Sequence, residues 1–179
     1  MPALELLIRT SRLDLVAATL EHVKAELQDR SALARLIGAG VPEEWPPGEY
    51  DRDAQEFFRT QFESDDSLVG WLTWYAIARN ERGEREALVA GAGFMGPPAE
   101  GTVEIGYSVV EWARGRGYAT EIVNALVAHA FRHPAVEEVV AHTTDANVAS
   151  TKVLLRCGFR RVGPGPEPGS VEYRAKRRA

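Results

Sequence analysis

One stretch decides the fold: Trp112-Ala113-Arg114-Gly115-Arg116-Gly117-Tyr118-Ala119-Thr120-Glu121. It joins a strand-like run, residues 103–110, to an expected crossover helix over residues 118–132, whose apolar positions between residues 122 and 131 recur at helical spacing. The first amides of a helix lack partners within the helix, and the helix dipole favours negative charge there. Gly115 and Gly117 let the backbone close on an anion without a Cβ in the way. The stretch therefore predicts a turn that binds phosphate.

A second motif, Asn147-Val148-Ala149-Ser150, follows another apolar run, residues 136–142, and opens a helix-like segment that ends before Gly158-Phe159. Asparagine is one of the residue types that cap helices. A Gly-x-Gly turn alone is a weak signal, because an ordinary tight turn with a basic face has the same sequence. The order of strand, phosphate turn, helix, strand and capped helix favours a functional interpretation.

Together the two motifs resemble the GNAT superfamily of acyl-CoA-dependent N-acyltransferases. The phosphate motif of that superfamily, Gln/Arg-x-x-Gly-x-Gly/Ala, is matched by Arg114, Gly117 and Ala119, and its later helix pattern is matched by Asn147, Ser150, Gly158 and Phe159. The match is close over residues 85–163. Residues 103–107 and the Asn-x-x-Ser pattern look most like the branch that contains the ribosomal-protein N-terminal acetyltransferases.

The resemblance implies an α/β fold with a central, mostly antiparallel sheet, in which parallel strands splay around an acyl-CoA cleft. Acetyl-CoA is the implied co-substrate, its pantetheine arm lying along one strand and its pyrophosphate at the glycine turn. The implied cofactor-binding residues are Tyr107, Ser108, Val109, Arg114, Gly115, Arg116, Gly117, Tyr118, Ala119, Thr120 and Asn147. Lys152 and Arg156, at i and i+4 on the later helix, are placed to meet the phosphates.

Glu104 is the candidate general base, because members of this branch often carry a glutamate here that is thought to accept the amine proton. Alternation along the strand puts Glu104 on the face opposite Val103 and Ile105. A free glutamate titrates near ~4.3 and an amine near ~8 to ~10, so burial or a water relay must assist it. The alternative is a solvent-facing strand glutamate.

Ser150 is the candidate acid for the departing thiolate. Many members of the superfamily place a tyrosine seven residues after the motif asparagine, but this chain has Leu154 there, which excludes a tyrosine acid at that position. Members with serine at the position of Ser150 are thought to use its hydroxyl near the thioester sulfur. The alternative is that Ser150 only completes the start of a helix capped by Asn147. A backbone amide near residues 107–109 is the implied oxyanion donor.

Length, charge and cysteine content limit the function classes. A chain of 179 residues suits one domain, which we expect to span residues 1–179, and its net charge of −5 argues against a general nucleic-acid binder. The single Cys157 agrees with a reducing compartment, and the four histidines show no metal-ligand spacing, so no metal is predicted. No run is long enough to span a membrane and no signal peptide is evident, so a cytoplasmic protein is expected.

The remaining pattern predicts helices early in the chain and strands in the middle. A strand over residues 13–18 leads to a helix capped by Thr19, and a second helical segment covers residues 32–37. Asp51 or Asp53 caps a further helix, whose Ala54, Phe57, Phe58 and Phe62 form a core stripe. Strands over residues 71–78 and 87–95 form an antiparallel hairpin, and a last strand follows residue 169.

The predicted function is acetyl transfer from acetyl-CoA to a primary amine by direct attack on the thioester. The alternative is a non-catalytic GNAT-fold module that binds acyl-CoA as a sensor. The acceptor, a small-molecule amine or a protein N-terminus, is left open, although the acidic residues Glu43, Glu44, Glu49, Asp51 and Asp53 suit a cation. The oligomeric state is also open, with a homodimer among the alternatives.

Overall fold

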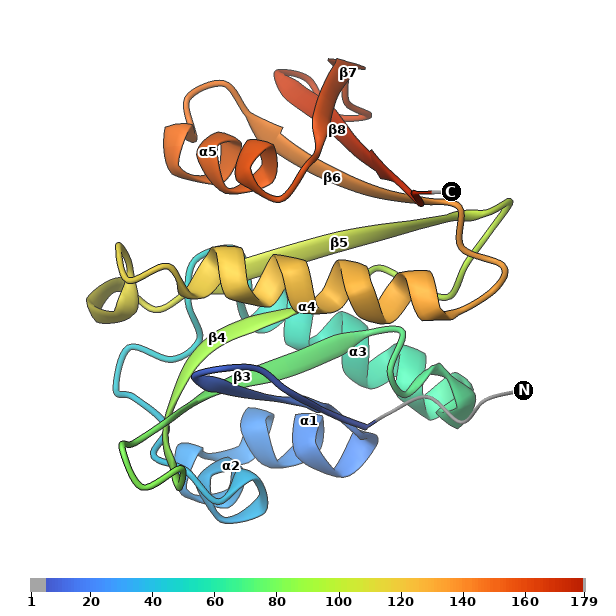
Figure 1. Ribbon diagram of the computed structural model, residues 1–179. Coiled ribbons are helices and arrows are strands. Elements are labelled where there is room, and N and C mark those ends of the chain that lie inside the picture. The colour runs from blue at the N-terminus through green and yellow to red at the C-terminus, as the bar shows by residue number, and fades with distance from the viewer. Residues whose placement is uncertain (1–5, 179) are drawn as a thin grey trace.

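The computed structural model describes residues 6–178, which form one mixed sheet flanked by helices (Figure 1). The strands are β1 (Leu7–Arg9), β2 (Leu13–Ala17), β3 (Thr73–Arg79), β4 (Arg85–Phe94), β5 (Thr102–Val109), β6 (Glu138–Thr144), β7 (Arg160–Pro164) and β8 (Ser170–Lys176). The helices are α1 (Leu20–Gln28), α2 (Arg30–Ile37), α3 (Arg52–Ser64), α4 (Tyr118–Arg132) and α5 (Val148–Arg156), with short 3₁₀ turns η1 (Asp66–Leu68) and η2 (Glu111–Ala113).

The eight strands lie in the order β1-β2-β3-β4-β5-β6-β8-β7. Strands β5 and β6 pair in parallel, and the other neighbours pair antiparallel. A parallel pair needs a crossover connection, which α4 supplies. The predicted α/β fold, with a mostly antiparallel sheet and one parallel step, is therefore confirmed.

The helices cover the two faces of the sheet. In Figure 1, α4 crosses in front of β5 while α3 lies behind the sheet, and α3 packs against α1. Helix α3 begins where predicted, because the side chain of Asp51 accepts a hydrogen bond from the amide of Ala54. Phe58 and Phe62 are buried in the core, but Phe57 is 46% exposed. The prediction that Phe57 belongs to the core stripe is therefore wrong, since this ring faces a cavity described below.

Two strands at the sheet edges were not predicted. Strand β1 has three residues, and β7 is exposed or half-buried along its length, so neither shows an apolar alternation. Strand β3 begins at Thr73, two residues later than predicted. Trp71 and Leu72 are apolar and buried, as strand residues often are, but they lie in the bend before the strand. Edge strands bury little of one face, which weakens their signal in the sequence.

The parallel pair separates partway along its length. Pairing between β5 and β6 runs from Thr102 opposite Glu138 to Ile105 opposite Ala141 and then stops. Beyond that point β5 continues beside β4 as far as Val109, whereas β6 continues beside β8. The two strands splay, as the resemblance implied, and this opening positions the site.

Candidate active site

A cavity of about 480 Å³ lies where β5 and β6 separate. Its walls come from the end of β5, the turn before α4, the first turn of α4, and one side of α5 together with the residue before it. The lining residues are Tyr107, Ser108, Val109, Ala113, Arg114, Gly115, Gly117, Tyr118, Ala119, Thr120, Asn147, Ala149, Ser150, Lys152, Val153 and Arg156. The structure thus brings together all but one of the residues predicted to bind the cofactor.

The glycine turn has the backbone shape that its sequence predicts. Gly115 has φ 72° and Gly117 has φ 80°, values in the left-handed region that favours glycine. Gly117 is the N-cap of α4, which starts at Tyr118 as predicted. The free amides of the first turn of α4 therefore border the cavity, where an anion is stabilised.

Basic side chains surround this helix start. Arg114 donates from Nε to the carbonyl of Val109 at 3.1 Å, and Lys152 and Arg156 approach from α5. Arg116 is the predicted residue that does not line the cavity. Its guanidinium lies over the ring of Trp112, 5.5 Å from the centroid. Positive charge is therefore concentrated on two sides of the anion position.

A second, smaller cavity of about 170 Å³ shares Tyr107 and Ser108 with the first. Its lining residues are Glu49, Tyr50, Ala54, Phe57, Phe58, Thr73, Gly91, Ala92, Gly93, Phe94, Met95, Gly106, Tyr107 and Ser108. Of the five acidic residues in the predicted acidic region, Glu49 lines this cavity and the other four do not. Tyr107 and Ser108, near the end of β5, therefore separate the two cavities and line both.

Glu104 is held by a histidine that sequence reasoning did not select. The Nδ1 atom of His142 lies 2.7 Å from Oε1 of Glu104, and its Nε2 lies 3.2 Å from Oε2 of Glu172. The side chain of Glu104 is 41% exposed and that of His142 is 18% exposed. Burial alone would lower the pKa of His142, but the hydrogen bonds to the two carboxylates outweigh it and raise the pKa.

No local pattern in the sequence links His142 to Glu104. The four histidines show no metal-ligand spacing, and Glu104, the partner of His142, is 38 positions away in the sequence. Only the register of β5 against β6, with Glu104 opposite Val140, places the two side chains together. A histidine two positions from that register partner is on the same face of the sheet, because side chains alternate.

The side chain of Ser150 pairs with that of Tyr107, which was predicted from the sequence only as a cofactor-binding residue. The hydroxyl of Tyr107 lies 2.9 Å from Oγ of Ser150, and burial raises the pKa of Tyr107 to about 12 despite the opposing hydrogen bond with Ser150. The oxygen that caps α5 is Oδ1 of Asn147, which accepts from the amide of Ser150 at 3.1 Å. Leu154 is fully buried. The hydroxyl of Ser150 is thus directed at Tyr107 while Asn147 supplies the cap.

Among residues 6–178, no group of three or more His, Cys, Asp or Glu side chains is arranged to hold a metal ion. Within the same residues, no helix is both long enough and apolar enough to cross a membrane.

Comparison with known proteins identifies the family. The model of the acetyltransferase (GNAT) domain matches residues 12–160. The chain is 28% identical over 155 residues to the uncharacterized N-acetyltransferase YjdG of Bacillus subtilis (strain 168), covering 86% of this chain and 89% of that protein.

Solved structures share the fold. An acetyltransferase of Salmonella typhimurium, described as modifying the N-terminal serine of ribosomal protein L7/L12, is 20% identical with a TM-score of 0.65, covering 96% of this chain and 99% of that one. The microcin C7 self-immunity acetyltransferase, solved with acetyl-CoA and AMP, is 18% identical with a TM-score of 0.61, covering 93% of each chain. With the family match over residues 12–160, these findings show that the chain belongs to the GNAT acetyltransferase family and is an N-acetyltransferase.

Proposed function

We propose that the protein transfers an acetyl group from acetyl-CoA to a primary amine by direct attack on the thioester. One observation carries the proposal: the cavity between the splayed strands ends at the same residues, Tyr107 and Ser108, as the second cavity. A donor in the first cavity and an acceptor in the second would therefore meet at the end of β5. Such positioning is a large part of what acyl transfer between two bound reactants requires.

The first cavity fits coenzyme A. The helix start at Gly117 and the cations of Arg114, Lys152 and Arg156 suit a pyrophosphate. Past Ile105, one edge of β5 has lost its partner β6, so its backbone groups are free to pair with the amides of an extended arm. Asn147, at the start of α5, faces the same cavity.

The proton of the amine is assigned to Glu104 together with His142. The amine must lose a proton as it attacks, and a carboxylate alone is a weak base for this task. In the pair, Glu104 takes the proton directly or through a water and passes it to Nδ1 of His142, while Nε2 of the same ring faces the carboxylate of Glu172. The raised pKa of His142 matches it to a proton that comes from an amine.

The thiolate is assigned to Ser150 together with Tyr107. Acetyl-CoA supplies the activated acyl group, so the chain has to position it and return a proton to the sulfur. Because the pKa of Tyr107 is about 12, its hydroxyl keeps its proton near neutral pH and can replace the proton that Ser150 donates. A backbone amide near residues 107–109 is assigned to the developing oxyanion.

The experiment is a screen of amines with acetyl-CoA that records release of the free thiol and the mass of the acetylated product. Time-dependent release that needs both the amine and the enzyme is expected. Binding of coenzyme A with no transfer to any amine would instead favour the acyl-CoA sensor. A protein N-terminus belongs in the screen, because the Salmonella typhimurium structure of similar fold is described as acting on one.

A further inference from the structure

The second cavity has an aromatic wall. Tyr50, Phe57, Phe58 and Phe94 all line it. The ring of Phe58 stacks on Tyr50 with centroids 6.1 Å apart and meets Phe57 edge-on at 5.4 Å. Phe57 stays exposed although its neighbour Phe58 on α3 is buried. An exposed ring at the mouth of a cavity is the kind of apolar surface that a ligand covers.

The floor opposite this wall is backbone and thioether. Gly91 and Gly106 lie on β4 and β5, where a Cβ would stand 2.9 Å from Cγ of Tyr50 and 2.8 Å from Cε of Met95. The hydroxyl of Tyr50 donates to the buried Oε2 of Glu26 at 2.9 Å, and this hydrogen bond fixes the ring that lines the cavity. The space is therefore shaped by apolar groups on both sides.

Charge is sparse in this cavity. Among the described residues that line it, Glu49 alone carries a charge, and it lies at the exposed loop before α3. The volume of 170 Å³ is below the roughly 300 to 1,000 Å³ of pockets for drug-sized ligands. A polyamine or an amino sugar would leave polar groups against the rings without hydrogen bonds, which is unfavourable.

We propose that the acceptor is a small primary amine carried on an apolar, aromatic body. The apolar body lies between the rings of the wall and Met95, and the amine points along β5 toward Glu104. Alternation puts Glu104, Gly106 and Ser108 on one face of β5, and the terminal methyl of Met95 lies over Gly106, between the other two side chains. This inference rests on the proposed function and names the substrate class for the same site.

The test compares the kcat/KM of thiol release from acetyl-CoA for 2-phenylethylamine, spermidine, kanamycin and a peptide with an N-terminal serine. We expect 2-phenylethylamine to exceed each of the others by about tenfold or more, the discrimination typical of an apolar pocket. Faster transfer to spermidine, kanamycin or the peptide overturns the assignment, as does coenzyme A binding without transfer to 2-phenylethylamine. Absence of coenzyme A binding would instead remove the proposed function itself.

A pair of variants locates the effect. Phe57→Asp replaces an exposed ring of the wall with a carboxylate, so KM for 2-phenylethylamine should rise about tenfold while coenzyme A affinity stays constant. The matched control is Val162→Asp, which changes a 53% exposed residue of β7 outside both cavities. An equal KM change in both variants, or none in Phe57→Asp, contradicts the proposed wall.

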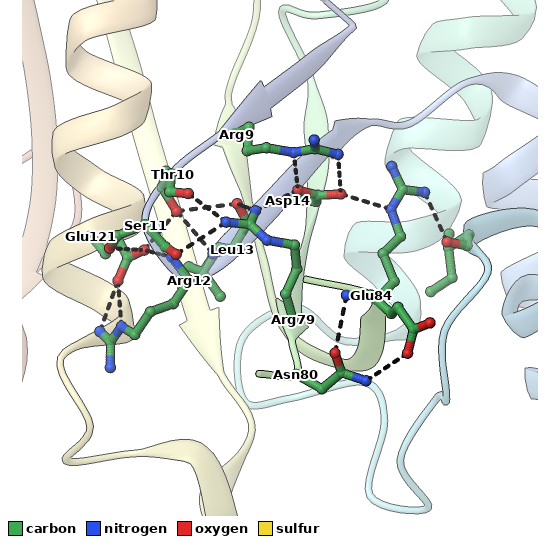
Figure 2. Close-up of polar contacts among 12 residues, drawn as sticks. Arg9, Thr10, Ser11, Arg12, Leu13, Asp14, Arg79, Asn80, Glu84 and Glu121 are labelled. Carbon is green, nitrogen blue, oxygen red and sulfur yellow. Dashed lines mark hydrogen bonds and ion pairs between the residues drawn. The ribbon is translucent and has the colours of Figure 1, made fainter. Parts of the chain in front are cut away.

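A different observation concerns the turn between β1 and β2, which contacts the start of α4 (Figure 2). Oε1 of Glu121 accepts hydrogen bonds from the hydroxyls of Thr10 at 2.6 Å and Ser11 at 3.1 Å and from the amide of Arg12 at 2.9 Å. Its Oε2 accepts from Nε of Arg12 at 2.8 Å. Glu121 is thus fixed by a segment more than a hundred residues away in the sequence.

Arg12 extends from this contact to the glycine turn. Its Nη1 donates to the carbonyl of Arg116 at 2.9 Å, and its guanidinium lies over the ring of Tyr118, 4.6 Å from the centroid. A Cβ on Gly117 would stand 3.4 Å from its Nη2. One guanidinium therefore contacts the residues on both sides of Gly117.

The β1–β2 turn is itself held from the core side. Figure 2 shows the side chain of Arg79 reaching the turn, where its Nη2 donates to the carbonyls of Thr10 at 2.7 Å and Ser11 at 3.0 Å. The same side chain donates from Nη1 to Oδ1 of the buried Asp14 at 2.6 Å. The turn that carries Arg12 is therefore anchored independently of α4.

We infer that Arg12 and Glu121 are positioning residues that hold the glycine turn in its phosphate-binding shape, an inference that rests on the proposed function. A carboxylate in the first turn of α4 would by its charge repel a pyrophosphate bound there. Charge alone therefore predicts that Glu121→Gln tightens coenzyme A binding. A positioning role predicts the opposite, because the amide keeps one acceptor but loses the ion pair with Arg12.

Isothermal titration with coenzyme A separates these outcomes. We expect Glu121→Gln and Arg12→Met each to raise Kd about tenfold, with the double variant no worse than the weaker single variant, since both remove one contact. Arg9→Met is the matched control, because Arg9 contacts Asp14 in the same hairpin and not the glycine turn. Tighter or unchanged binding by Glu121→Gln overturns the inference, as does a lowered Tm with unchanged Kd in Arg12→Met. Wild-type protein that fails to bind coenzyme A refutes the proposed function first.

Discussion

Two glutamates in this molecule have opposite surroundings. Glu26 on α1 is 8% exposed, and burial raises its pKa although four hydrogen bonds oppose the shift. The donors to Glu26 are Trp45, Tyr50, Gln55 and Tyr75, at 2.6 to 2.9 Å. Glu104 on β5 is 41% exposed and bonded to His142. Neutral donors saturate Glu26 and fix it in the core, whereas Glu104 is open beside a titratable partner, as its proposed role in proton transfer requires.

The largest effect is expected at the saturated glutamate. Glu26→Ala leaves buried donors on α3, β3 and the loop before α3 without an acceptor, at about 1–3 kcal/mol each. The free energy of unfolding in urea should fall by about 4 kcal/mol or more. Glu26→Gln keeps one acceptor oxygen and should lose less. A loss below about 1 kcal/mol in Glu26→Ala would contradict the structural role of Glu26.

At the open glutamate the effect should fall on turnover. Glu104→Gln removes the proton acceptor while keeping the size of the side chain, so kcat should drop about 10²- to 10⁴-fold. Coenzyme A affinity should hardly change, because Glu104 is not among the residues that line the first cavity. Steady-state rates and titration calorimetry on the same sample check both expectations. Wild-type turnover in Glu104→Gln would make it a structural strand residue.

His142 should set the pH dependence. Its pKa is raised above the ordinary value near 6.5, so the neutral form that can take a proton appears only as pH rises through the raised pKa. The kcat/KM profile should therefore climb above pH 6.5, and His142→Gln should lose that limb with about a tenfold lower plateau. An identical limb in the variant would assign the titration to another group.

The contribution of His142 to folding stability should fall as pH rises, whereas its contribution to kcat/KM should increase. A group whose pKa is raised in the folded state stabilises fully below its unfolded pKa, and this contribution is lost as pH rises through the folded pKa. The wild type should lose stability relative to His142→Gln as pH increases above 6.5. Urea unfolding at several pH values measures the difference, and a parallel dependence in both proteins would contradict the ion pair with the two carboxylates.

The smallest effect is expected at Ser150. Its hydroxyl meets Tyr107 while Asn147 caps the helix, so Ser150→Ala should lower kcat by less than about tenfold and leave stability nearly unchanged. Coenzyme A thiolate is a tolerable leaving group, which limits the loss. Tyr107→Phe should act in the same direction. A normal kcat with a lowered Tm would leave Ser150 a helix-start residue only.

Features encoded in one continuous segment were predicted correctly from the sequence, whereas side-chain contacts between distant segments were not predicted. The glycine turn and α4 are encoded within one continuous segment, so Gly117 and Tyr118 were placed to the residue. The pairs Glu104–His142 and Tyr107–Ser150 join residues 38 and 43 positions apart, and only the crossover through α4 brings them together. The aromatic wall of the second cavity was missed for a related reason, since a helical apolar stripe cannot show that Phe57 faces a cavity instead of the core.

The splayed strands and the glycine turn are the centre of this account, and coenzyme A binding tests them most directly. The measurement is the Tm of wild type, Gly117→Val and Gly83→Val with and without coenzyme A at about 100 times a plausible Kd, where a bound ligand adds about 2.7 kcal/mol. Gly83 has φ 79° in an open turn, so its variant carries matched backbone strain away from the site. We predict a rise for wild type and Gly83→Val and none for Gly117→Val. No rise in wild type, or an equal rise in Gly117→Val, would contradict the account.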